Sequence, residues 1–208
     1  MNDSKAVFLD RDGTVVELLY DEESGYIDSA VRAEQIRLIP GAAEALRRLK
    51  SAGYKLIIVS NQPGVAKGRM SIEEFEETRR KMKNLLAAKG VTIDGEYYCL
   101  HHPNALIAEY RKVCDCRKPR SGLILKAVHE HGLKPEECYM VGDDLLDIKA
   151  GKAAGCKTIL LSHITGMLMD ILDKEGLHPD SFARNLDQVS NVILQAPFMH
   201  SEKRQDRD

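Results

Sequence analysis

The sequence lacks the features that would attach a protein to a membrane or to nucleic acid. No apolar run approaches the length needed to cross a bilayer, and no secretory leader precedes the first apolar run, so we expect a cytoplasmic protein without a membrane partner. A net charge of −2 over 208 residues provides no general attraction to nucleic acid. We find no internal repeat and no low-complexity segment.

Cysteine is also scarce, with five in the chain. In a cytoplasmic protein these cysteines are better explained as metal ligands or free thiols than as disulfides. The length suits one domain with a sizeable core. We predict a single domain over residues 1–196 followed by a disordered tail over 197–208, and a monomer, since no exposed apolar stripe requires a partner.

Apolar runs alternate with amphipathic stretches along the chain, which predicts an α/β fold with a mostly parallel sheet and helices on both faces. We expect strands over 6–9, 55–60, 94–99, 137–142, 156–161 and 180–184. We expect helices over 42–52, 71–89, 121–131, 145–154 and 187–194, with Ser71 and Ser121 as caps. The pattern over 163–177 suits either a helix or a loop. A polar insert over 15–36 is too short to fold alone, so we expect no large cap domain.

Two aspartates follow the first predicted strand. Asp10 and Asp12 emerge at its carboxyl end, which is the edge where ligands bind in an open α/β sheet. Carboxylates in this position can divide the work, one attacking and the other transferring a proton. Gly13 and Thr14 allow the chain to turn away and leave room for a charged ligand. Taken alone, the segment is better explained as an Asp-rich turn.

Other polar residues are expected at the same edge. Ser60 ends a predicted strand, Lys118 precedes a helix, and the acidic segment 142–147 follows another strand. Taken singly, its aspartates (Asp143, Asp144 and Asp147) would simply cap the next helix. Gathered together, several carboxylates require a cation, and oxygen ligands suit Mg²⁺. A hydroxyl and an ammonium beside that ion would cradle a phosphoryl group.

This order of motifs resembles the haloacid dehalogenase superfamily of phosphotransferases, which has a Rossmann-like fold. The resemblance implies that Asp10 attacks phosphorus to form an aspartyl-phosphate and that Asp12 is the general acid and base. It implies that Mg²⁺ is held by the Asp10 carboxylate, the Asp12 backbone carbonyl and Asp143. Ser60 and Lys118 would hold the phosphoryl oxygens.

The segment 99–116 is a loop of about seventeen residues, and a loop that long needs a reason inside a compact domain. Its two ligand pairs provide three sulfurs and one imidazole, the donor set of a closed, structural zinc site. The predicted zinc ligands are Cys99, His101, Cys114 and Cys116. His102 competes with His101, which we prefer because its spacing from Cys99 mirrors that of the cysteine pair. Cys138 and Cys156 lie in predicted strands and are expected to be buried apolar residues.

Three segments resemble one branch of the superfamily, the D-glycero-D-manno-heptose 1,7-bisphosphate and histidinol-phosphate phosphatases. They are 61–68, 97–103 and 114–119, and the first two, together with the long spacer before Cys114, look most like the heptose enzymes. The resemblance implies that Arg117, Asn61 and Gln62 bind substrate. In two places the chain departs from the branch: the insert is acidic at 21–23, and Asp144 stands where a basic residue is common, so that it would strengthen metal binding or repel substrate.

The sequence therefore predicts a Mg²⁺-dependent phosphatase with a structural zinc. It would remove the C7 phosphate of a heptose bisphosphate in the biosynthesis of nucleotide-activated heptose. Histidinol phosphate is the alternative substrate, since its cationic amine suits the acidic insert. The charge argues against a phosphatase of nucleic-acid ends. A silent zinc-binding module would need to have lost Asp10 and Asp12, which are both present.

Overall fold

A six-stranded parallel sheet with the order β5-β4-β1-β6-β7-β8 organises the structure. The structure is a computed structural model that describes residues 4–20, 25, 27–162 and 164–195. The strands are β1 (Ala6–Leu9), β4 (Lys55–Asn61), β5 (Gly95–Cys99), β6 (Tyr139–Gly142), β7 (Lys157–Leu161) and β8 (Ser181–Ala183). The chain proceeds outward from β1 in one direction and returns as β6 on its other side. The β1–β6 boundary is thus the topological switch point, where ligands bind in such sheets.

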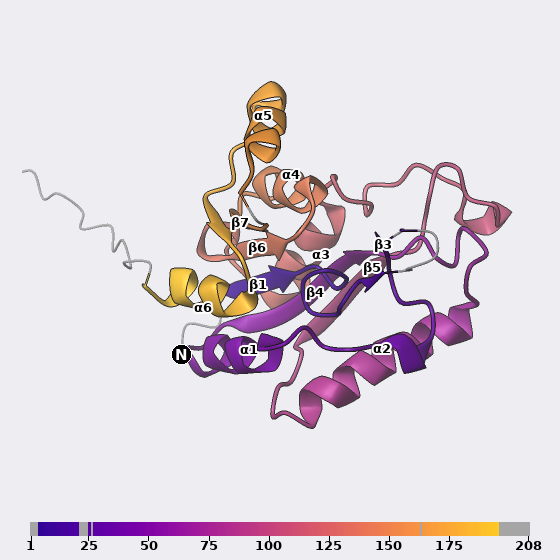
Figure 1. Cartoon of the computed structure of the whole chain (residues 1–208), viewed down its shortest axis with the longest axis horizontal. Helices are drawn as coiled ribbons and strands as arrows, with labels where there is room; N and C mark the ends of the chain where they lie inside the picture. Colours follow the sequence, from indigo (N-terminus) through magenta and orange to yellow (C-terminus); the bar gives the residue numbers. More distant parts are fainter. Residues whose placement is uncertain (1–3, 21–24, 26, 163, 196–208) are drawn as a thin grey trace, which may run out of the picture.

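Helices cover both faces of the sheet, so the predicted α/β class is confirmed. They are α1 (Ala42–Ser51), α2 (Ile72–Ala87), α3 (Gly122–His131), α4 (Leu145–Ala153), α5 (Gly166–Glu175) and α6 (Leu186–Gln195). Figure 1 shows α1 and α2 on one side of the sheet, α3 and α4 on the other, and α5 projecting at the top of the view.

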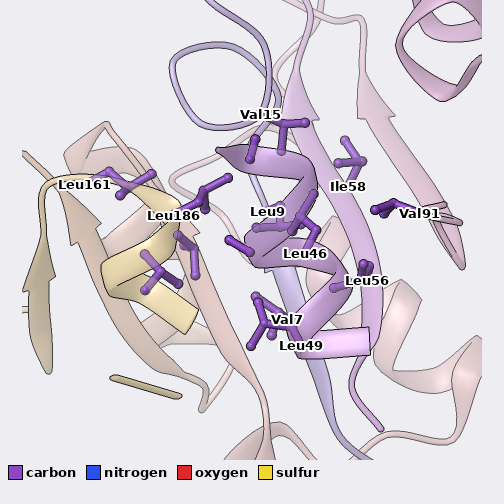
Figure 2. Close-up of a cluster of buried hydrophobic side chains, with 14 of the residues drawn as sticks. Val7, Leu9, Val15, Leu46, Leu49, Leu56, Ile58, Val91, Leu161 and Leu186 are labelled. Atoms are coloured by element: carbon purple, nitrogen blue, oxygen red, sulfur yellow. The ribbon is translucent and has the colours of Figure 1, made fainter. Parts of the chain in front are cut away.

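The alternation of side chains along β1 explains the two apolar layers. Val7 and Leu9 pack into the layer that α1 covers, whereas Ala6 and Phe8 pack into the layer beneath α3 and α4. Figure 2 shows Leu46 and Leu49 of α1 next to Leu9 and Val7 of β1. Each fully buried leucine contributes about 1.5–3 kcal/mol. Burial on both faces is the reason that the strand is entirely apolar.

The helix starts differ in how well the sequence predicts them. Ser71 begins α2 with the expected capping box, since its Oγ accepts from the Glu74 amide at 3.1 Å and its amide donates to the Glu74 carboxylate at 2.7 Å. Ser121 occupies the N-cap position of α3 as predicted, but its side chain makes no cap hydrogen bond. The amide of Gly122 instead donates to the Asp115 carbonyl at 3.0 Å, so the 99–116 loop completes this helix end.

Four further segments can be compared with the prediction. The ambiguous stretch 163–177 contains helix α5, and the predicted strand over 137–142 begins only at Tyr139 because a 3₁₀ turn, η3 (Pro135–Glu137), precedes it. The insert over 15–36 contains a short antiparallel pair, β2 (Leu19–Tyr20) with β3 (Ile27–Asp28), and the 3₁₀ turn η1 (Ala33–Gln35). A third 3₁₀ turn, η2 (Ala108–Tyr110), lies in the 99–116 loop.

Two predicted features cannot be compared with the fold. The acidic stretch 21–23 and the predicted tail over 197–208 lie outside the described residues. Among the helices of the described part of the chain, none has the length and apolar character needed to span a bilayer.

Candidate active site and metal cluster

The carboxyl ends of β1, β4 and β6 open into one cavity of about 320 Å³. Asp10 follows β1 directly, and its amide donates to the Val141 carbonyl of β6 at 2.9 Å, which holds the two strand ends together. The residues that line the cavity are Asp10, Asp12, Leu18, Ser29, Asn61, Pro63, Arg117, Lys118, Asp143, Asp144, Leu146 and Asp147. A larger hollow of about 490 Å³ at the start of α1 contains no group of carboxylates.

Three carboxylates and one lysine form the centre of the cavity. Oxygens of Asp10, Asp143 and Asp147 all lie within 4.8 Å of one another. Lys118 Nζ lies 2.9 Å from Asp10 Oδ1, also pairs with the Asp147 carboxylate, and donates to the Val59 carbonyl at 3.0 Å. The side chain of Lys118 is only 4% exposed. A buried ammonium thus joins the predicted nucleophile to the acidic segment after β6.

The charges in this cluster are not balanced by the lysine alone. Burial, and then the nearby Asp10 charge, raise the pKa of Asp143 to about 6. Burial raises the pKa of Asp147 to about 7 even though Lys118 opposes the shift. Burial by itself would lower the pKa of Lys118, but Asp10 and Asp147 outweigh burial and raise it. Three carboxylates around one ammonium fit a divalent cation with oxygen ligands.

Gly13 packs directly against the acidic segment. Its φ of +76° is in the left-handed region, and a Cβ at this position would lie 2.1 Å from Asp143 Oδ2. The neighbouring Thr14 hydroxyl donates to Asp143 Oδ1 at 3.3 Å. The turn after β1 therefore sets the position of Asp143 as well as the positions of Asp10 and Asp12.

Asp144 does not join the carboxylate cluster. It is the N-cap of α4, where its Oδ1 accepts from the Leu146 amide at 2.9 Å, and its role as a metal ligand stays a prediction. Asp147 is the residue that the sequence reasoning missed at this site. Its position three residues after the N-cap Asp144 is that of a capping box, in which its Oδ2 accepts from the Asp144 amide at 3.2 Å, and this spacing is the signal that its carboxylate turns back toward the start of α4.

Asp12 turns toward the protein rather than toward the other carboxylates. Its carboxylate accepts hydrogen bonds from Arg11 at 2.9–3.1 Å and from the Gln62 amide at 2.5 Å. The same Gln62 amide donates to the Ser60 hydroxyl at 3.1 Å. Gln62, predicted to bind substrate, is therefore buried between Asp12 and Ser60.

Asn61 is also predicted to bind substrate. Its side-chain amide forms hydrogen bonds with the backbone of Lys118. Its Nδ2 donates to the Lys118 carbonyl and its Oδ1 accepts from the Lys118 amide, both at 3.0 Å. Asn61 also lines the cavity, so it reaches the site while it holds the lysine. Arg117 lines the cavity as well, and its guanidinium donates to the His101 carbonyl at 3.3 Å.

The 99–116 loop brings the four predicted zinc ligands together. The sulfur of Cys99 lies 3.6 Å from that of Cys114 and 3.4 Å from that of Cys116, and the last two sulfurs are 3.0 Å apart. His101 Nδ1 lies 3.3 Å from the Cys116 sulfur. Zn–S bonds of about 2.3 Å place sulfurs about 3.8 Å apart in a tetrahedron, so the set needs to expand only slightly around zinc.

His102 is outside this cluster. Its Nδ1 accepts from the Asn104 amide at 3.1 Å, whereas His101 faces the sulfurs. The other two cysteines, Cys138 and Cys156, are buried in the apolar layer under α3 and α4, as predicted. The donor set of three sulfurs and one imidazole fits zinc and leaves no position for a substrate.

Comparison with known proteins agrees with this geometry. The family model for haloacid dehalogenase-like hydrolases matches residues 19–155. The chain belongs to the haloacid dehalogenase-like hydrolases. Members of this family named below are phosphatases, and one was crystallised with magnesium.

Three similar proteins are named as phosphatases of a heptose 1,7-bisphosphate. The D-glycero-beta-D-manno-heptose-1,7-bisphosphate 7-phosphatase of Pasteurella multocida (strain Pm70) is 42% identical over 157 residues, which are 76% of this chain and 80% of that protein. The enzyme of that name from Escherichia coli (strain K12) is 40% identical over 156 residues, 75% of this chain and 78% of that protein. The crystal structure of D,D-heptose 1,7-bisphosphate phosphatase from B. bronchiseptica, complexed with magnesium and phosphate, has a TM-score of 0.75 and 27% identity, covering 93% of this chain and 99% of that one.

Proposed function

We propose that this chain is a Mg²⁺-dependent phosphatase that removes the C7 phosphate of D-glycero-D-manno-heptose 1,7-bisphosphate. The observation that carries the proposal is the cluster of Asp10, Asp143 and Asp147 around Lys118 at the switch point of the sheet. Relatives of about 40% identity that bear the name of this activity support the choice of substrate. The reaction belongs to the biosynthesis of nucleotide-activated heptose.

In this proposal the reacting groups come from β1. A carboxylate oxygen of Asp10 forms a bond to phosphorus while the ester P–O bond breaks, and the departing sugar oxygen takes a proton from Asp12. Asp12 then accepts a proton from the water that hydrolyses the aspartyl-phosphate. Lys118 and the Ser60 hydroxyl bind phosphoryl oxygens and stabilise the charge that develops there.

Both metals have residues that suit them. Asp10, Asp143 and the Asp12 backbone carbonyl would hold Mg²⁺, which when bound neutralises charge so that a carboxylate can approach a phosphate dianion. Asp147 supports Lys118 from the other side. Cys99, His101, Cys114 and Cys116 would hold a structural zinc just upstream of Arg117 and Lys118.

Arg117 is the proposed contact for the part of the substrate that does not react, since a guanidinium can bind a second phosphate or sugar hydroxyls in a bidentate way. Asn61 faces the same cavity. We place the catalytic unit in one domain over residues 1–196. We also place the protein in the cytoplasm, which fits free cysteines at the zinc ligands because zinc binding requires reduced thiols, and we propose that it is a monomer.

Histidinol phosphate is the second candidate substrate. Asp144 lines the cavity and is exposed, so its carboxylate would attract the cationic amine of that compound. The heptose bisphosphate carries a second phosphate instead, which the same carboxylate would repel. The two substrates therefore make opposite demands on one residue.

The test is release of inorganic phosphate by the purified protein in Mg²⁺. Both anomers of heptose 1,7-bisphosphate and histidinol phosphate are compared by kcat/KM, with Asp10→Asn as the inactive control. The proposal predicts preference for a heptose anomer and loss of turnover in Asp10→Asn. Preference for histidinol phosphate would overturn the substrate, and full activity of Asp10→Asn would overturn the mechanism.

A further inference from the structure

Arg11, the residue between the two aspartates, is completely buried beside the active site. Its Nε lies 3.1 Å from both carboxylate oxygens of Asp12, and its second terminal nitrogen donates to Asp12 Oδ1 at 2.9 Å. Within the described ranges, Asp12 is the only acidic group with which Arg11 forms an ion pair. Burying a guanidinium without a counter-charge is strongly destabilising, so the ion pair with Asp12 compensates for the burial of Arg11.

Other elements hold the Arg11 guanidinium in place. One terminal nitrogen donates to the Thr78 hydroxyl of α2 at 3.2 Å, and that hydroxyl in turn donates to the Phe75 carbonyl at 2.7 Å. The other terminal nitrogen reaches the Ala30 carbonyl of the 15–36 insert at 3.5 Å. The arginine is therefore anchored to α2 and to the insert while it contacts Asp12.

Gln62 contacts Asp12 from the opposite side. Its Nε2 donates to Asp12 Oδ2 at 2.5 Å and to the Ser60 hydroxyl at 3.1 Å, and its backbone amide donates to the Cys99 carbonyl at 2.8 Å. Gln62 has no freedom to follow a substrate, because it is 4% exposed and bonded at both ends. The Asp12 carboxylate is thus hydrogen-bonded from both sides, at Oδ1 mainly by Arg11 and at Oδ2 by the side-chain amide of Gln62.

We propose that Arg11 and Gln62 are positioning residues that hold the Asp12 carboxylate in the orientation needed to deliver its proton to the leaving oxygen. This inference rests on the proposed function, in which Asp12 is the general acid. Neither side chain touches the substrate in this arrangement; both act through Asp12. A carboxylate that rotates away leaves the attack by Asp10 intact but removes the proton that the departing oxygen needs.

Leaving groups distinguish this role from a structural one. A sugar alkoxide is a poor leaving group and needs the proton from Asp12, whereas p-nitrophenolate departs without one. The kinetic constant kcat/KM reports the steps up to formation of the aspartyl-phosphate, so hydrolysis of that intermediate does not enter. Loss of the phosphate site or of folding lowers kcat/KM for both substrates alike.

The experiment compares Arg11→Met and Gln62→Leu with Asp12→Asn as the benchmark. Each is assayed on the sugar phosphate that the wild type hydrolyses best and on p-nitrophenyl phosphate, with circular dichroism as the check of folding. Positioned acids contribute about 10²–10⁴-fold, so we expect both positioning variants to lose roughly tenfold or more in kcat/KM on the sugar phosphate relative to the aryl phosphate.

The outcomes separate the positioning role from the proposed function. Selective loss in Asp12→Asn together with equal loss on both substrates in the two positioning variants would overturn the positioning role and leave the proposed function standing. Absence of selectivity in Asp12→Asn would overturn the acid role of Asp12 and the positioning role with it. Gln62→Leu keeps the test decisive if removal of the buried arginine prevents folding.

Discussion

Replacing Gly13 by alanine tests whether the turn after β1 sets the position of Asp143. A Cβ on residue 13 would lie 2.1 Å from Asp143 Oδ2 and 2.5 Å from its Cγ, so the whole carboxylate must move by about 1 Å. Displacement of that size at a reacting centre costs about 10²-fold in rate. The left-handed backbone adds about 1–2 kcal/mol of destabilisation for any residue with a Cβ. We therefore expect Gly13→Ala to fold with reduced stability and to lose about 10²-fold in kcat/KM.

Gly90 offers a matched control for the backbone cost. Its φ is +75°, compared with +76° at Gly13, and apart from its chain neighbours nothing lies within 4 Å of the position that a Cβ would take there. Gly90→Ala should therefore lose the same stability in urea unfolding while kcat/KM and Mg²⁺ affinity remain those of the wild type. Calorimetric titration with Mg²⁺ should show weaker binding in Gly13→Ala alone. Wild-type kcat/KM and Mg²⁺ affinity in a folded Gly13→Ala protein would show that the turn does not set the position of Asp143.

Three further predictions concern charge and metals. Asp147→Asn removes a buried partner of Lys118, and kcat/KM should fall about 10–100-fold; unchanged kinetics would show that the pair has no role. Cys114→Ser should lose bound zinc and melt at lower temperature, while zinc content stays at the wild-type level in the control Cys138→Ser; zinc retained in Cys114→Ser would contradict the ligand set. The folded pKa values of Asp143, about 6, and Asp147, about 7, lie above their ordinary value of 3.8. At pH values between the ordinary and the folded pKa, the folded state therefore binds more protons than the unfolded state. Without added Mg²⁺ the free energy of unfolding should therefore fall by about 3 kcal/mol from pH 5.5 to pH 8, and Mg²⁺ should restore it at pH 8; equal urea stability at both pH values would argue against the shifts.

The convergence of the main site residues could be predicted from sequence because parallel strands share a carboxyl edge. Asp10, Ser60 and Asp143 each follow a buried apolar run, and β1, β4 and β6 prove to be neighbours in the sheet. Lys118 could be placed there only through its position before a helix. The ligand spacing of the 99–116 loop likewise indicated a metal cluster, whose four members the structure brings together.

The remaining features depend on side-chain direction, which spacing does not determine. Asp144 and Asp147 cap the start of α4 together, yet only Asp147 also pairs with Lys118. Arg11 occupies the variable place of the Asp-x-Asp motif, and only its burial against Thr78 and Asp12 reveals a role. Helix α5 escaped definite prediction because its apolar pattern is weak.

The most direct test of the proposed function is a ³¹P NMR time course of heptose 1,7-bisphosphate with the wild-type protein and Mg²⁺. We expect the C7 phosphomonoester signal to be replaced by inorganic phosphate while the C1 glycosyl phosphate signal persists. With Asp10→Asn we expect no change in either signal. Loss of the C1 signal, or no turnover of this compound by a protein that hydrolyses histidinol phosphate, would show that the C7 phosphate of the heptose is not what this enzyme removes.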